Sequence, residues 1–73
     1  MSFKININNQ IIEIQKNDYF TIGHLKNIIY NRISVHSSHQ HIYVNNEYVK
    51  DVNLRLSSIA DEKSKIQVLV SLC

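Results

Sequence analysis

The stretch FKININNQIIEIQ, residues 3–15, decides the fold of this chain. Over residues 3–7 apolar side chains alternate with polar ones, which is the period-two pattern of a β-strand with one buried face. The same alternation continues over residues 12–15. The segment between the two runs is rich in asparagine, which tolerates the left-handed backbone that tight hairpin turns require. Residues 1–16 are therefore predicted to form a β-hairpin.

An amphipathic helix is predicted next. Apolar residues recur at spacings of three and four and share one helical face, at Ile22, Leu25, Ile29 and Ile33. Thr21 is placed to act as the N-cap, and His24 occupies the position where a capping box would carry Glu or Gln. The only glycine, Gly23, falls in the first turn, where it either permits close packing or has no special role. The pattern predicts a helix over residues 22–33.

The second half of the chain is predicted to return to strands. Residues 34–39 are expected to form a surface loop, and Ile42 and Val44 flank Tyr43 in a third strand. An Asn-Asn turn then leads to a short fourth strand at Tyr48 and Val49. A single helical turn is expected within 54–59, and apolar alternation over 66–70 predicts the last strand.

Composition favours one small intracellular domain spanning residues 1–73. The chain is 44% apolar, has a single cysteine and shows neither a secretory leader nor a long apolar run. We therefore expect a cytoplasmic or nuclear protein, monomeric, with no membrane association. The net charge is +2 and the basic residues are scattered, so no nucleic-acid partner is expected.

The order of elements and the residues that fill them resemble the ubiquitin-like, or β-grasp, family. The matching segments are Thr21-Ile22-x-x-Leu25-Lys26-x-x-Ile29, Gln40-His41-Ile42-Tyr43-Val44, Asn45-Asn46-Glu47-Tyr48-Val49-x-Asp51, the core segment 54–59 and Ser64-Lys65-Ile66-Gln67-Val68-Leu69-Val70. The resemblance covers essentially the whole chain. It implies an α+β fold in which one helix packs across a mixed sheet of four to five strands, with the last strand at the sheet centre.

Two features of that family bear on function. Conjugated members end in Gly-Gly, whereas this sequence ends Val70-Ser71-Leu72-Cys73. It therefore resembles the diglycine-free ubiquitin-like proteins, and the sulfur-carrier relatives that need a terminal glycine are disfavoured.

The second feature is a binding patch on the sheet. Strand alternation turns Tyr43 and Leu69 outward on neighbouring strands, at positions similar to the middle and one flank of the ubiquitin patch. His41 and Gln67 flank them, and the remaining edge falls near Asn8, which is polar. These five residues are the predicted partner-binding site, although a Tyr-Leu pair could also serve only as a cross-strand contact.

Other chemistry is not expected. His36, His39 and His41 lie close in sequence, but no cysteine or well-placed carboxylate completes a zinc site. His39 and His41 could share a strand face and make binding sensitive to pH. Nothing near Cys73 in sequence activates its thiol. We predict no catalytic residues, no metal and no cofactor.

The predicted function is non-covalent binding of proteins through the sheet face. Three alternatives remain open: a covalent or atypical ubiquitin-like modifier, a parasite or viral ubiquitin mimic, and a nucleic-acid-binding module that uses the modest positive charge.

Overall fold

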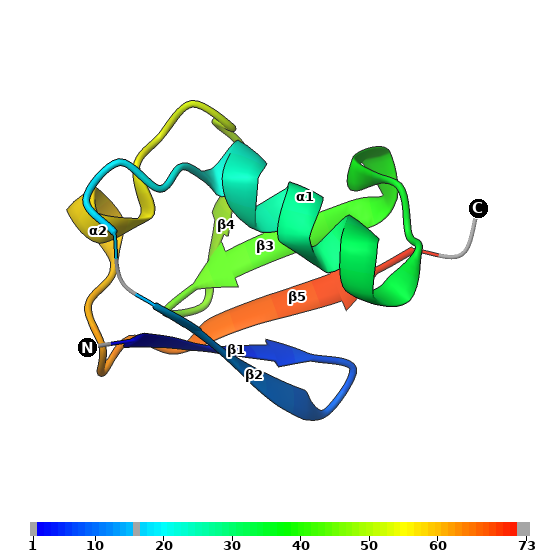
Figure 1. Ribbon diagram of the computed structural model, residues 1–73, viewed down its shortest axis with the longest axis horizontal. Helices are drawn as coiled ribbons and strands as arrows, with labels where there is room; N and C mark the ends of the chain where they lie inside the picture. Colours follow the sequence, from blue (N-terminus) through cyan, green and yellow to red (C-terminus); the bar gives the residue numbers. More distant parts are fainter. Residues whose placement is uncertain (1, 16, 72–73) are drawn as a thin grey trace.

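The computed structural model describes residues 2–15 and 17–71. Its elements in chain order are β1 Ser2–Ile7, β2 Gln10–Gln15, α1 Ile22–Ile33, the short 3₁₀ helix η1 Ser37–His39, β3 Gln40–Val44, β4 Glu47–Val49, α2 Leu56–Ile59 and β5 Ile66–Val70. The strands form one sheet in the order β2-β1-β5-β3-β4, with α1 crossing one of its faces (Figure 1). Only the β1–β5 pair is parallel within this sheet. The predicted α+β architecture is confirmed, with five strands and the last one at the centre.

Both hairpins turn on a pair of asparagines. Asn8 and Asn9 have φ angles of 49° and 68°, and Asn45 and Asn46 have φ angles of 52° and 71°. Ile7 pairs with Gln10 across the first turn, so Asn8 and Asn9 alone form the loop. Positive φ at both central residues is the requirement of a type I′ turn, whose twist matches that of the flanking strands.

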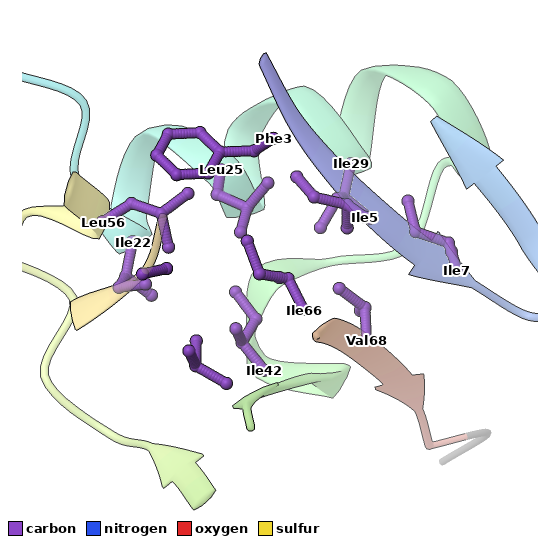
Figure 2. Close-up of a cluster of buried hydrophobic side chains, with 12 residues drawn as sticks. Phe3, Ile5, Ile7, Ile22, Leu25, Ile29, Ile42, Leu56, Ile66 and Val68 are labelled. Atoms are coloured by element: carbon purple, nitrogen blue, oxygen red, sulfur yellow. The ribbon is translucent and has the colours of Figure 1, made fainter. Parts of the chain in front are cut away.

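The core lies between α1 and the inner face of the sheet. It contains the apolar residues predicted from strand and helix periodicity, and Figure 2 shows side chains of the two layers pointing toward one another. Phe3, Ile5, Ile22, Leu25 and Ile29 are completely buried. Burying one such side chain stabilises the fold by roughly 1.5–3 kcal/mol.

The start of α1 is held by a capping box in which histidine replaces the expected acid or amide. The Thr21 hydroxyl accepts a hydrogen bond from the His24 amide at 3.2 Å, and His24 Nδ1 accepts one from the Thr21 amide at 3.1 Å. His24 therefore does the work of the Glu or Gln that the pattern lacks.

Gly23 has a structural role at the same end of the helix. Its amide donates to the Val52 carbonyl at 2.9 Å, and a Cβ at position 23 would lie only 3.3 Å from that oxygen. The residue therefore permits the close approach of the segment before α2, which is one of the two possibilities that the sequence left open.

The connection from α1 to β3 is more ordered than the predicted surface loop. It contains η1, and it is tied to α1 by Gln40, whose side chain is 1% exposed. Gln40 Nε2 donates to the Lys26 carbonyl at 3.0 Å and to the Val35 carbonyl at 2.9 Å. A buried side chain thus satisfies two backbone acceptors that the sequence pattern could not reveal. In the described part of the chain, no helix has the length and apolar character needed to cross a membrane.

Candidate functional site

The outer face of the sheet, opposite α1, carries a row of side chains that crosses all five strands. The pairing registers place Asn6 opposite Ile11 and Gln67, and Tyr43 opposite Gln67 and Tyr48. Directly opposite residues on one face of a sheet lie within contact distance of each other. We define the outer sheet face as Ile11, His41, Tyr43, Tyr48, Gln67 and Leu69.

Aromatic contacts organise one half of this face. The rings of Tyr43 and Tyr48 have centroids 5.4 Å apart and are tilted by 51°. The His41 ring lies 6.2 Å from the ring of Tyr48. Tilted rings at this separation attract each other through their quadrupoles, so the cluster holds its side chains in place before any partner arrives.

Three side chains of the outer sheet face are open to solvent. Leu69 pairs with His41 and is 49% exposed, while Tyr48 is 52% exposed and Ile11 69% exposed. Single exposed apolar residues are common, but a group of them on one sheet face has a surface that a partner could cover.

The structure brings four of the five predicted site residues together. His41 and Tyr43 lie on β3, and Gln67 and Leu69 lie on β5. His41 is directly opposite Leu69, and Tyr43 is directly opposite Gln67. Asn8 lies in the turn after β1 and is exposed; it directly follows Ile7, which pairs with Val68, the residue before Leu69. Its positive φ gives it a structural reason to be asparagine.

Two members of the outer sheet face were not predicted, although the sequence held the signal for both. A two-residue turn at Asn45-Asn46 pairs Tyr43 with Tyr48, which places Tyr48 on the same face. Since Ile12 faces the core side with Ile5, its neighbour Ile11 must face outward. Counting register outward from the turns would have found both residues.

The end of β5 meets the predicted histidine pair. The Ser71 amide donates to the His39 carbonyl at 2.9 Å, and the Ser71 hydroxyl lies 3.3 Å from His41 Nε2 and 3.5 Å from His39 Nδ1. His39 ends η1 and His41 lies on β3, so the two do not share a strand face as predicted; one hydroxyl lies close to both rings instead.

A metal site would need three or four ligands close together. No group of three His, Cys, Asp or Glu residues in the described ranges is placed to hold a metal ion. Cys73 and Leu72 lie outside the described residues, so the predictions about the cysteine and the last residues of the chain stay predictions.

The architecture itself matches known structures. The chain superposes over its full length on the ubiquitin-like domain of the Arabidopsis thaliana protein At2g32350, with a TM-score of 0.83, 15% identity and 79% of that chain covered. It has the ubiquitin-like fold. A computationally designed protein based on human erythrocytic ubiquitin matches 99% of the chain with a TM-score of 0.81 and 16% identity, and 92% of that protein is covered.

A third structural match is a crystal structure of ATBAG1 in complex with HSP70. It has a TM-score of 0.78 and 20% identity over 96% of this chain, which spans only 40% of the matched chain. No protein-family model and no curated protein sequence matches the chain. The likeness therefore concerns the ubiquitin-like fold, and function must be argued from the site.

Proposed function

We propose that this ubiquitin-like chain binds proteins non-covalently through its outer sheet face. The observation that carries the proposal is a set of exposed side chains on one sheet face: Tyr48 on β4 and Leu69 on β5 lie on either side of β3 and its half-buried Tyr43, and Ile11 lies on the edge strand β2. Tyrosine is among the residues that dominate binding energy when a partner excludes water from it.

Preorganisation supports the same conclusion. The strands fix the backbone of this face, and the Tyr43–Tyr48 contact restricts two large side chains in advance. Binding a partner then costs this chain less conformational entropy than binding through mobile loops would, where immobilising each side chain costs about 0.5–1.5 kcal/mol.

Similarity to a protein complex points in the same direction. ATBAG1, which contains a region of this fold, was solved with HSP70. We carry over only the general idea of a protein partner, because the present chain spans 40% of the matched chain.

The proposed binding is non-covalent. The single glycine of the 73 residues is Gly23 in α1, so these residues contain no Gly-Gly pair for adenylation. Incubation with ubiquitin-like activating enzymes and ATP should leave the protein unmodified, and an adduct that survives denaturation would contradict this part of the proposal.

The binding surface is tested by quantitative affinity capture with the double variant Tyr48→Ala/Leu69→Ala. Both side chains are about half exposed, so their removal should leave the fold intact. We expect the recovery of wild-type partners to fall at least tenfold, because a pair of interface anchors commonly contributes more than about 1.4 kcal/mol to binding.

The matched control is Tyr19→Ala, which also removes an exposed tyrosine but lies in the connection before α1, against Arg55. The control should retain every partner. Equal recovery with the double variant and the wild type would mean that the outer sheet face is not the binding surface.

A further inference from the structure

A groove runs along α1 on the side of the molecule that carries the helix. Its volume is about 660 Å³, and it is bounded by the exposed flank of α1, by η1 and by Val52 in the segment before α2. We call it the helix groove and define it by the residues that carry its chemistry: His24, Lys26, Asn27, Tyr30, His36 and Val52.

Two histidines in this groove are held with their Nε2–H groups available as donors. His24 Nδ1 accepts from the Thr21 amide, and His36 Nδ1 accepts from the Ser38 amide at 3.3 Å. In a neutral imidazole one nitrogen accepts and the other donates, so the proton of each ring resides on Nε2. The backbone thus fixes both rings as hydrogen-bond donors.

Lys26 adds a positive charge on the η1 side of the groove. Its ammonium group donates to the Ser37 carbonyl at 3.4 Å, which directs the side chain toward η1 and leaves further N–H donors on the same nitrogen. The Asn27 amide and the Ser37 hydroxyl add further donors to the lining, whereas the Ser38 hydroxyl lies 3.0 Å from His36 Nδ1 and donates to it.

The groove carries no compensating negative charge. None of the described residues that line it is Asp or Glu. Asp51 precedes Val52, but its carboxylate accepts from the Asn53 amide at 2.9 Å. The first-turn amides of α1 already donate to the carbonyls of Leu54 and Val52 and to Thr21, so the anion preference of the groove rests on its side chains. The chemistry of the groove therefore favours an anionic group.

Apolar walls and the length of the groove indicate what carries that group. Tyr30 is 47% exposed and packs edge-on against the His36 ring, while Val52 is 43% exposed near the other end. From Gly23 to Tyr30 the helix rises about 10 Å, which matches about three extended residues. A free anion would leave the apolar walls uncovered, whereas a peptide could cover them.

We propose that the helix groove binds an extended segment of a partner protein, with an Asp or Glu side chain directed at Lys26 and the neighbouring His36 imidazole, and apolar neighbours against Tyr30 and Val52. This site is separate from the outer sheet face, because α1 and the sheet's outer side lie on opposite sides of the core (Figure 1). The two binding functions can therefore stand or fail independently.

The test is an NMR titration of the amide-labelled protein with acetyl-Leu-Asp-Leu-amide. We expect saturable shifts for amides of α1 and η1, and affinity at least about tenfold lower for acetyl-Leu-Asn-Leu-amide, since a charge-assisted bond contributes more than a neutral one. Equal shifts with both peptides, no shifts, or shifts confined to the sheet would overturn the proposal. So would inorganic phosphate at the same ionic strength matching the acidic peptide, because the site would then recognise only a simple anion.

Two variants locate the interaction. Lys26→Gln should weaken the acidic peptide about tenfold, whereas Arg32→Gln, an equal charge change at an exposed residue of α1 outside the groove, should change its affinity less than twofold. Asn27→Asp adds a carboxylate at an exposed position and should abolish acidic-peptide binding without disturbing the fold. Unchanged affinity in Asn27→Asp, or an equal loss in Arg32→Gln, would contradict the assignment.

Discussion

Gln40 provides the sharpest test of how the α1–β3 connection is held. Its side chain is 1% exposed, and its two Nε2–H groups donate to the carbonyls of Lys26 and Val35. Gln40→Met keeps a side chain of similar length and removes both donors. The two lost hydrogen bonds cost about 2 kcal/mol, and removing Gln40 Oε1, a buried acceptor that has no partner among the described residues, offsets about 1 kcal/mol, so the variant should lose about 1 kcal/mol of unfolding free energy.

Gln40→Glu should lose more stability than Gln40→Met near pH 7. A buried carboxylate at this position would face two carbonyl oxygens, so its pKa would be raised in the folded state. The destabilisation is full above that raised pKa and decreases as the pH falls through it. The difference between the Glu and Met variants should therefore shrink on acidification.

Urea denaturation at several pH values measures both effects. For a chain of this size, with a slope near 1 kcal/mol/M, the midpoint of Gln40→Met should fall by about 1 M with the slope unchanged. A Met variant within about 0.5 kcal/mol of wild type, a size typical of neutral surface changes, would refute the role given to Gln40. A gap between Glu and Met that does not depend on pH would refute the electrostatic argument.

Three further predictions concern local structure. Asn46→Ala should lower stability by about 1–2 kcal/mol because alanine resists positive φ, whereas Asn46→Gly should not; equal thermal melts for both variants would contradict the turn assignment. Gly23→Ala should lack the usual gain of about 0.4–1 kcal/mol, because its Cβ would press on the Val52 carbonyl; a full gain in urea denaturation would show that the contact is loose. Asp61 accepts hydrogen bonds from the Lys63 amide, the larger effect, and from the Ser64 hydroxyl, and these hold its pKa below the usual 3.8 in the folded protein. The ionised Asp61 therefore stabilises the fold above pH 3.8, and this stabilisation is lost as the pH falls through the lowered pKa. Asp61→Asn should therefore flatten the acid limb of the stability profile, and an identical acid limb in variant and wild type would show that Asp61 does not contribute.

Local sequence rules predicted the elements well because each rule acts over a few residues. Alternation located β1 and β5, helical spacing located α1 at residues 22–33, and asparagine pairs located both hairpin turns. Tyr48 and Ile11 could have joined the predicted site through register alone.

Features that depend on tertiary contacts could not be predicted in this way. The role of Gln40 requires knowing that α1 ends next to the start of β3, and that of Gly23 requires knowing where Val52 packs. The helix groove is likewise lined by both His24 and His36, which lie 12 positions apart (36 minus 24), because the chain reverses after α1. A histidine acting as the capping-box acceptor is also outside the usual Glu or Gln pattern.

The most direct test of protein binding through the outer sheet face is site-specific photocrosslinking in cells that express the protein. A photoreactive phenylalanine analogue replaces one residue at a time, at positions 48, 69 and, as a control away from the face, 19. The account predicts the same discrete adducts from positions 48 and 69 and their absence from position 19. Adducts that appear at position 19 but not at 48 or 69 would contradict it.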